Sequence, residues 1–254
     1  MGAEHGHRLH YHAHSLVHRL PAHCKVVALV AFVLCVVATP TTAYAAYAVH
    51  AAGLLAAIRV SRVPAAFIGR RMVVETPFVV FAVLLPFVAT GQQTTVWGVA
   101  VSERGLEAAI ALVCKGTLGV VASLLLAATT EPRDLLAGLE RLRLPRQLVE
   151  IMGFMIRYLD VSTAELSRMR VARLSRGFQT RGVRAWPVLA RSGGALFIRS
   201  YERGERVHLA MLSRGYTGSL PALVPAPATA VHWRHAALLP LVALLTVATA
   251  WAVV

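Results

Sequence analysis

The chain of 254 residues is 57% hydrophobic and only 15% charged, with a mean hydropathy of +0.61. Ordinary soluble domains are less apolar and more charged than this, so the composition indicates a membrane protein. Lys and Arg total 26 against 12 acidic residues, which gives a formal net charge of +14. Because cytoplasmic loops of membrane proteins are enriched in Lys and Arg, these cations must be placed relative to the membrane before nucleic acid is considered as a partner.

Residues 1–23 form a polar, histidine-rich segment, which we expect to be a cytoplasmic tail. It holds seven of the eleven histidines: His5, His7, His10, His12, His14, His18 and His23. A histidine tract is compatible with metal handling, but composition alone favours a weakly basic tail. No metal site and no cofactor are predicted. The cysteines at 24, 35 and 114 lack a paired spacing and are interpreted as small apolar fillers.

Apolar runs predict about five transmembrane helices. A membrane helix needs about 20 apolar residues. The region 24–130 has room for four such helices, over about 24–39, 41–58, 72–90 and 106–130, with a turn at Pro40 between the first two. The polar stretch 91–105 is expected to be a loop. A proline-containing linker at 219–235 leads to a fifth apolar span at 236–254.

Three polar side chains fall inside the predicted spans: His50, Glu75 and Lys115. An ionisable group near the bilayer centre costs about 2.5 to 3.5 kcal/mol on insertion scales, so such a group should face protein or snorkel. A structural role is favoured for Lys115. Three groups are too few to line the pathway of an independent permease, which argues against that class of function.

The region 131–218 differs in character, with sixteen arginines and eight acidic residues. Leucines recur at helical spacing over 135–144, and Pro145 ends that pattern before a second amphipathic run over about 146–176. A weaker apolar stretch follows at 185–198. These patterns predict amphipathic helices close to the membrane.

The arginine distribution predicts the orientation of the chain. The N-terminal tail, the loop at 59–71 and the region 131–218 are rich in arginine, whereas the turn at Pro40 and the loop at 91–105 are not. Four spans before residue 131 place all basic parts on one side, which the positive-inside rule identifies as the cytoplasm. We therefore expect an all-α, multi-pass protein of the cell membrane with a cytoplasmic N-terminus.

One motif, Ala-x-x-Ser-Arg-Gly-aromatic, occurs twice, at 172–178 and 210–216. Each glycine could end a helix, which would put the arginine at a helix C-terminus, where a cation is favoured. An arginine fork can pair with a carboxylate of a partner, and small neighbours allow close approach. Contact with anionic lipid headgroups is the alternative. The candidate docking residues are Ala172, Ser175, Arg176, Gly177, Ala210, Ser213, Arg214 and Gly215.

Catalysis and nucleic-acid binding are not expected. The spans contain no His/Asp/Glu cluster and no nucleophile–base arrangement, and the chain lacks a Gly-x-x-x-x-Gly-Lys-Ser/Thr loop, so any ATP hydrolysis must come from a partner. Leucines interleave with the arginines of 131–218, and this pattern close to a membrane argues against nucleic acid as the partner.

The paired motif resembles the coupling motifs of the transmembrane T component of energy-coupling factor transporters, the CbiQ or EcfT family. Further matches are Leu16-Val17-His18-Arg19-Leu20-Pro21 before Lys25, Thr129-Thr130-Glu131-Pro132-Arg133-Asp134-Leu135-Leu136, and Arg157-Tyr158. The resemblance implies a scaffold in the lipid bilayer that joins two ATP-binding-cassette ATPases to a substrate-binding integral membrane subunit. It also implies that Arg176 and Arg214 each enter a groove on one ATPase, on coupling helices that cross near the membrane.

The cargo implied by the resemblance is cobalt or nickel. The tail, the Leu-Pro-x-x-x-Lys segment and the Thr-Thr-Glu-Pro stretch look more like the cobalt and nickel branch than the vitamin branches. The alternatives are a T component serving vitamin-type substrate subunits and an independent permease. Ser175 and Ser213 stand where alanine or another residue often precedes the arginine of the family motif, and because their size is small the docking role is retained.

Overall fold

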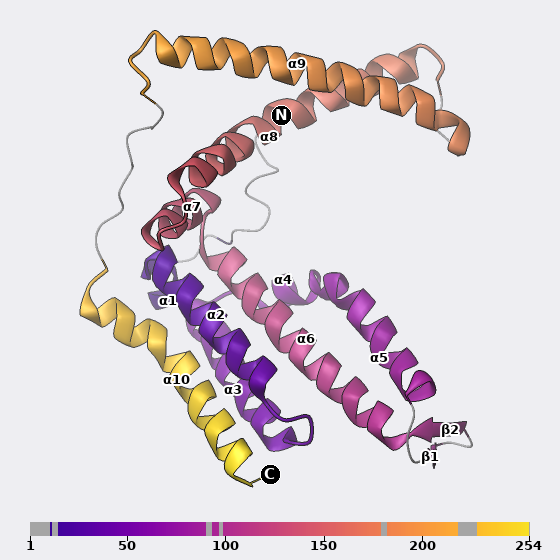
Figure 1. Cartoon of the computed structure of the whole chain (residues 1–254), viewed down its shortest axis with the longest axis vertical. Helices are drawn as coiled ribbons and strands as arrows, with labels where there is room; N and C mark the ends of the chain where they lie inside the picture. The colour runs from indigo at the N-terminus through magenta and orange to yellow at the C-terminus, as the bar shows by residue number, and fades with distance from the viewer. Residues whose placement is uncertain are drawn as a thin grey trace. The chain divides into compact units, whose positions relative to one another are not determined.

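A computed structural model describes Tyr11 and residues 15–89, 93–96, 99–178, 182–217 and 228–253. These residues are helical almost throughout, which confirms the all-α prediction. They divide into two compact units (Figure 1). The described residues from Tyr11 to Gly138, together with 228–253, form the bundle, and the described residues within 139–217 form the α8–α9 unit, named after its two long helices.

The bundle contains the apolar helices. Its elements are α1 (Leu16–Arg19), α2 (Ala22–Ala38), α3 (Tyr44–Ser61), α4 (Ala65–Gly69), the 3-10 helix η1 (Met72–Glu75), α5 (Thr76–Val88), β1 (Gln93–Val96), β2 (Val99–Ser102), α6 (Glu103–Thr129), most of α7 (Pro132–Arg141) and α10 (Ala230–Val253). Three segments are long and apolar enough to cross a membrane: Tyr44–Ser61, Glu103–Thr129 and Ala230–Ala252. The shorter apolar helices Ala22–Ala38 and Met72–Val88 coincide with the other two predicted spans.

The first apolar run folds into two helices that reverse at Pro40, as predicted. Proline cannot continue a helix because it lacks the backbone N–H. The turn is closed by Thr39, whose Oγ1 donates to the Cys35 carbonyl at 3.0 Å, and by Tyr47, whose hydroxyl donates to the Pro40 carbonyl at 3.1 Å. Thr39 Oγ1 also lies 3.2 Å from Nε2 of the buried His50. One of the three polar groups inside the spans therefore has a structural role.

The stretch between α5 and α6 was expected to be a loop, but it contains an antiparallel hairpin. Strands β1 and β2 pair from Gln93 opposite Ser102. Both strands are rich in threonine and valine, and these β-branched residues favour extended backbone over the loop that polar composition suggested. Ser102 then starts α6 early, at Glu103, because its Oγ accepts from the Gly105 N–H at 3.4 Å.

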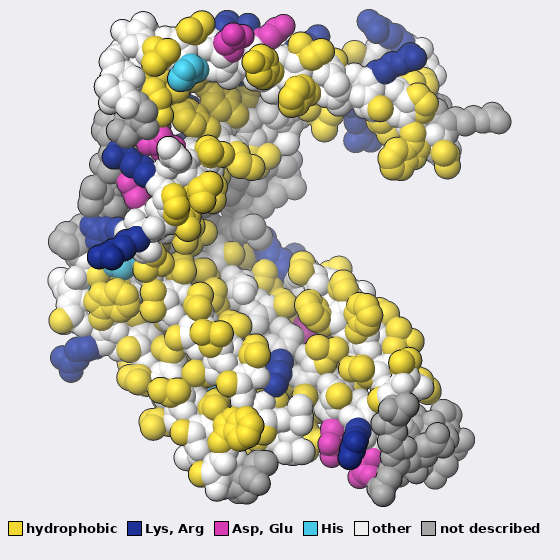
Figure 2. Space-filling view, in the orientation of Figure 1, with side chains coloured by type: hydrophobic (Ala, Val, Ile, Leu, Met, Phe, Trp, Pro, Cys, Tyr) yellow, Lys and Arg dark blue, Asp and Glu magenta, His cyan; other side chains and the backbone are white. Residues whose placement is uncertain are grey.

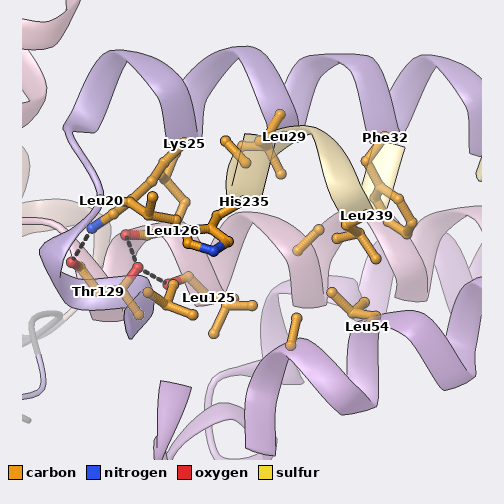
Figure 3. A pocket seen from close by; sticks show the side chains of 15 residues that line it. Leu20, Lys25, Leu29, Phe32, Leu54, Leu125, Leu126, Thr129, His235 and Leu239 are labelled. Carbon is orange, nitrogen blue, oxygen red and sulfur yellow. Dashed lines mark hydrogen bonds between the residues drawn. The ribbon is translucent and has the colours of Figure 1, made fainter. Parts of the chain in front are cut away.

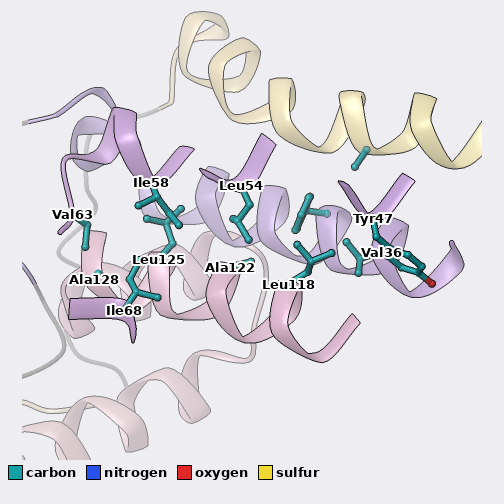
Figure 4. Close-up of a cluster of buried hydrophobic side chains, with 12 residues drawn as sticks. Val36, Tyr47, Leu54, Ile58, Val63, Ile68, Leu118, Ala122, Leu125 and Ala128 are labelled. Atoms are coloured by element: carbon teal, nitrogen blue, oxygen red, sulfur yellow. The ribbon is translucent and has the colours of Figure 1, made fainter. Parts of the chain in front are cut away.

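The bundle core lies among α2, α3, α4 and α6 (Figure 4). Its buried side chains are Phe32, Val36, Tyr47, Leu54, Ile58, Val63, Ile68, Leu118, Ala122, Leu125, Ala128 and Ala243. Helix α10 packs on α2 and α3, and α5 packs on α6. Helix α5 nevertheless exposes large apolar side chains such as Phe81 and Phe87. Figure 2 shows apolar side chains over most of the bundle face in view, as expected where lipid replaces water.

Two glycines allow helices of the bundle to approach closely. A Cβ atom at Gly105 would lie 2.8 Å from the Leu85 carbonyl oxygen of α5. A Cβ atom at Gly138 would lie 2.8 Å from the His23 backbone nitrogen, so Gly138 brings α7 directly against the first turn of α2.

The α8–α9 unit contains the end of α7, α8 (Arg146–Ser175), the 3-10 helix η2 (Val183–Ala185) and α9 (Trp186–Leu212). Helix α8 follows the prediction, with Pro145 directly before its first residue. The apolar stretch at 185–198 is only the first half of α9. Its second half is too polar to stand out as an apolar run, yet the helix continues to the second motif copy.

Candidate functional site

The first motif copy ends α8 in a Schellman cap. The Phe178 N–H donates to the Arg173 carbonyl at 3.1 Å, and the Gly177 N–H donates to the Leu174 carbonyl at 3.0 Å. Gly177 has a φ of +74°, in the left-handed region that glycine occupies without a Cβ penalty. The backbone itself therefore requires the glycine of the motif.

The second copy ends α9 in the same way. The Tyr216 N–H donates to the Met211 carbonyl at 3.0 Å, and the Gly215 N–H donates to the Leu212 carbonyl at 3.0 Å. Gly215 has a φ of +83°. The aromatic residue of each copy occupies the position after the glycine, where a Schellman cap usually makes a hydrophobic contact. The sequence repeat is thus one backbone structure formed twice.

The serines of the motif belong to the same caps. Ser175 Oγ donates to the Ala172 carbonyl at 3.0 Å, and Ser213 Oγ donates to the Ala210 carbonyl at 3.0 Å. Each serine satisfies a carbonyl in the last turn, where the helix offers no backbone partner. From the sequence, the alanine, serine and glycine of the motif were predicted to allow close approach of a partner. The structure adds that serine and glycine shape the helix end that holds the arginine.

The structure places Arg176 and Arg214 at the two helix C-termini with exposed side chains. A cation is favoured there by the helix dipole and by the unpaired carbonyl groups. In the described part of the chain neither guanidinium forms an ion pair. Both arginines are therefore free to bind an external carboxylate or another anion.

Helices α8 and α9 are antiparallel and cross (Figure 1). Near the start of α8, Glu150 accepts a hydrogen bond from the Tyr216 hydroxyl at 3.1 Å. Near the end of α8, Arg173 donates from Nη1 to Ser192 Oγ in the first turns of α9. A helix rises about 1.5 Å per residue, so the stretch of α8 from Glu150 to Arg173 separates the two motif copies by roughly 35 Å. They lie at opposite ends of the pair.

Glu165 connects the two helices between these ends. It forms ion pairs with Arg168 of α8, at 2.6 Å, and with Arg199 of α9. Hydrogen bonds from Arg168 and then from Arg199 hold the pKa of the Glu165 carboxyl below its usual range. The ionised carboxylate is therefore favoured in the folded unit.

The surroundings of the second copy include acidic groups. Arg146 Nε lies 3.5 Å from Glu150 and 3.9 Å from Glu140. Partial burial is the main cause that raises the pKa of the Tyr216 hydroxyl, and the hydrogen bond to Glu150 is the second. The Tyr216 ring meets His208 edge to face at 6.3 Å. The second cap is thus held to α8 by a polar network that carries both signs of charge.

Two further segments that carry the family resemblance meet in the bundle. Lys25 Nζ donates to the Thr129 carbonyl at 2.7 Å and to Thr130 Oγ1 at 3.2 Å, so the lysine closes the C-terminus of α6. Figure 3 shows Lys25, Thr129 and His235 along the wall of an apolar cavity of about 140 Å³. Both segments were recognised in the sequence as matches to the family, but no function was predicted for Lys25, Thr129 or Thr130. The contact joins positions more than a hundred residues apart, so local patterns could not reveal it.

The described histidines of the N-terminal segment have local partners. The His18 ring lies 2.8 Å from Ser15 Oγ and 3.0 Å from the Tyr11 carbonyl, and the His23 ring packs edge to face on Trp233 at 5.8 Å. His5, His7, His10, His12 and His14 lie outside the described residues. Within the described ranges, no cluster of three or more His, Cys, Asp or Glu side chains could hold a metal ion.

Comparison with known proteins gives consistent matches. A family model named CbiQ, described as "Cobalt transport protein", matches residues 13–223. The cobalt transport protein CbiQ of Rhodobacter capsulatus is 30% identical over 169 residues, which cover 64% of this chain and 68% of that protein. The energy-coupling factor transporter transmembrane protein EcfT of Bacillus selenitireducens is 28% identical over 224 residues, which cover 80% of this chain and 81% of that protein.

A shorter match is to an uncharacterized protein of Methanocaldococcus jannaschii. The two chains are 32% identical over 123 residues, which cover 48% of this chain and about half, 46%, of that relative.

Proposed function

The chain belongs to the CbiQ family of cobalt transport proteins, and from this membership we propose that it is the transmembrane scaffold subunit of an energy-coupling factor importer. In this proposal two ATP-binding-cassette ATPases dock on the α8–α9 unit, and a substrate-binding integral membrane subunit associates with the chain in the bilayer. The scaffold hydrolyses no ATP. It transmits the movement of the ATPases to the substrate-binding subunit.

The observation that carries the proposal is the pair of identical caps. An antiparallel helix pair whose two ends present the same backbone and the same exposed arginine has approximate twofold symmetry. Such a surface suits a dimer of ATPases, in which two similar grooves are also related by a twofold axis. Engagement at both ends raises the overall affinity, because the second contact forms within the same complex.

The crossing of α8 and α9 suggests how the movement is transmitted. The docking residues Arg176 and Arg214 lie at the far ends of the two helices, whereas Glu165 joins the helices between those ends. When ATP binding brings the ATPases together, the far ends move relative to one another. Rigid helices respond by changing their crossing angle, and this change tilts the substrate-binding subunit so that it releases its cargo.

The proposed arrangement in the membrane follows the sequence boundaries. A cytoplasmic tail at 1–23 precedes four spans within 24–130, a cytoplasmic coupling region at 131–218, a linker at 219–235 and a final span at 236–254. The arginine-rich parts then lie in the cytoplasm, where the ATPases and their ATP are found.

The proposed cargo is a cobalt or nickel ion, which is supported by the description of the family model. Uptake of radioactive cobalt and nickel by cells that express the complete transporter tests this assignment. Accumulation of either ion, lost when this chain is omitted, supports it. Uptake of neither ion, in a complex that still contains the ATPases, would refute this cargo and favour a T component that serves vitamin-type substrate subunits.

The docking proposal is tested by charge reversal at both caps. The double variant Arg176→Glu/Arg214→Glu is co-expressed with the ATPases and purified through a tag on this chain. We expect the ATPases to be lost from the complex and transport to stop. Arg170→Glu/Arg206→Glu is the matched control, because these exposed arginines lie on the same helices outside the caps. Undiminished co-purification with the first variant would refute docking through the caps.

A further inference from the structure

The α8–α9 unit contains a cleft beside the first cap, which shares Arg176 with it but extends to residues outside the docking motif. The cleft has a volume of about 580 Å³ and lies between the second half of α8 and the first half of α9. Its charged lining residues are Glu165, Arg168, Arg173, Arg176, Arg191 and Arg199. Five guanidinium groups therefore share one cleft with a single carboxylate.

The hydrogen bonds leave most of this positive charge uncompensated. Glu165 is shared by Arg168 and Arg199. Arg191, like Arg176, forms no ion pair in the part of the chain that the structure describes. Arg173 donates to Ser192 from Nη1, while its Nε is buried without a hydrogen-bond partner. A buried donor without a partner costs free energy, and so does like charge confined to one cleft.

We propose that this cleft binds a phosphate-type anion, presented by the headgroup of an anionic phospholipid or as free phosphate. The planar guanidinium fork matches the tetrahedral oxygens of phosphate, and Arg173 Nε and Arg191 supply donors that no residue of the described chain satisfies. A bound phosphate group would pair with these donors and offset the repulsion between them.

The second motif copy offers an internal comparison. It has the same cap, but Met211 stands at the position of Arg173, and its neighbour Arg146 is balanced by Glu140 and Glu150. Figure 2 shows dark blue side chains without neighbouring magenta ones at the end of the unit where α8 ends and α9 begins. The anion site is therefore a property of the first end and not of the repeated motif.

Apolar side chains in the cleft fit the lipid source. Met169 and Ala172 of α8 and Val188 and Ala195 of α9 line it together with the arginines. Apolar groups in a cationic cleft allow an acyl chain and a headgroup to bind together, whereas free phosphate would use the charged groups alone.

The experiment measures anion binding by the purified full chain in a zwitterionic detergent without ATPases, so its result does not depend on ATPase docking. Short-chain phosphatidylglycerol, short-chain phosphatidylcholine and inorganic phosphate are titrated separately by calorimetry. The test variant is Arg173→Gln/Arg191→Gln, which leaves the docking arginines intact. Arg170→Gln/Arg206→Gln removes the same charge from the same helices outside the cleft. Circular dichroism verifies that both variants keep their helices.

We expect the test variant to bind phosphatidylglycerol, free phosphate or both about tenfold more weakly than the wild type, with no such change in the control variant. A loss for phosphatidylglycerol alone identifies the lipid, and a loss for inorganic phosphate alone identifies the soluble anion. Equal losses in both double variants would mean diffuse attraction by net charge and would overturn the proposal. Absence of binding to the wild type would overturn it as well.

Discussion

Lys25 Nζ donates a hydrogen bond to the carbonyl oxygen of Thr129 at 2.7 Å, from the first turn of α2 to the last residue of α6. The other lysine of the chain makes the reverse contact, because Lys115 Nζ of α6 donates to the Val37 carbonyl near the end of α2 at 2.8 Å. Each lysine thus closes the C-terminus of the opposite helix. The two helices are antiparallel and are joined at two points along their length.

Replacement of Lys25 by methionine tests this arrangement. Methionine fills a similar volume but leaves the buried carbonyl of Thr129 and the hydroxyl of Thr130 without their donor. We expect the bundle to lose about 1 to 3 kcal/mol of stability, measured by thermal unfolding in detergent. Lys115→Met is the control with a smaller expected effect, because that side chain is only partly buried, whereas Lys25 is buried. Equal melting temperatures for Lys25→Met and the wild type would contradict the capping role.

Gly138 should tolerate no side chain. A Cβ there would lie 2.8 Å from the His23 backbone nitrogen, so Gly138→Ala must push α7 away from α2. We expect a cost of about 1 to 3 kcal/mol in thermal unfolding. At Gly119 an added Cβ meets nothing within 4 Å, so Gly119→Ala should be neutral or stabilising by about 0.5 to 1 kcal/mol. Similar melting temperatures for the two variants would show that α7 is not packed at Gly138.

The sequence was sufficient for the parts of the fold that depend on local patterns. The turn at Pro40, the five apolar helices and the break at Pro145 follow from residue types that act within one or two turns. The hairpin of β1 and β2 was missed because the polar composition of 91–105 concealed its β-branched residues. The contact of Lys25 with Thr129 was missed because it joins residues that are distant in sequence.

The candidate site divides in the same way. The repeat itself, and the expectation that Arg176 and Arg214 lie at helix ends, came from the sequence alone. The crossing of α8 and α9 was implied only by the family resemblance, because it depends on side-chain pairs such as Glu165 with Arg199, which no spacing along the chain encodes. The cleft at the first copy also depends on that crossing, since its arginines come from both helices.

A single substitution of the cap glycine should be enough to disturb the cap. Gly177→Ala places a Cβ on a residue with a φ of +74°, which costs roughly 1 kcal/mol and should loosen the last turn of α8. We expect faster hydrogen exchange at Gly177 and Phe178 and weaker co-purification of the ATPases. Gly177→Asn should restore part of both, because asparagine tolerates this conformation. Gly193→Ala, inside α9, should leave the ATPases bound, and an equal loss with it would contradict a role for the cap.

The contact between α8 and α9 should weaken in acid because it depends on the ionised form of Glu165. The folded pKa of this carboxyl is held below its ordinary value of 4.5 by Arg168 and Arg199, so its contribution is fully present above that pH and is lost as the pH falls through the folded pKa. Glu165→Gln lacks this contribution at every pH. Hydrogen exchange in α9 should therefore be faster in the variant than in the wild type near neutral pH.

The ratio of the two exchange rates at each pH removes the intrinsic effect of pH on exchange. We expect this ratio to fall towards one as the pH is lowered from neutral through the folded pKa of Glu165, which lies below 4.5, because the wild-type carboxylate is protonated there. Glu202→Gln provides the control, since among the described residues Glu202 pairs only with Arg206 on its own helix, at 3.9 Å, and its ratio should stay near one throughout. A ratio for Glu165→Gln that does not change with pH would show that another contact holds α8 to α9.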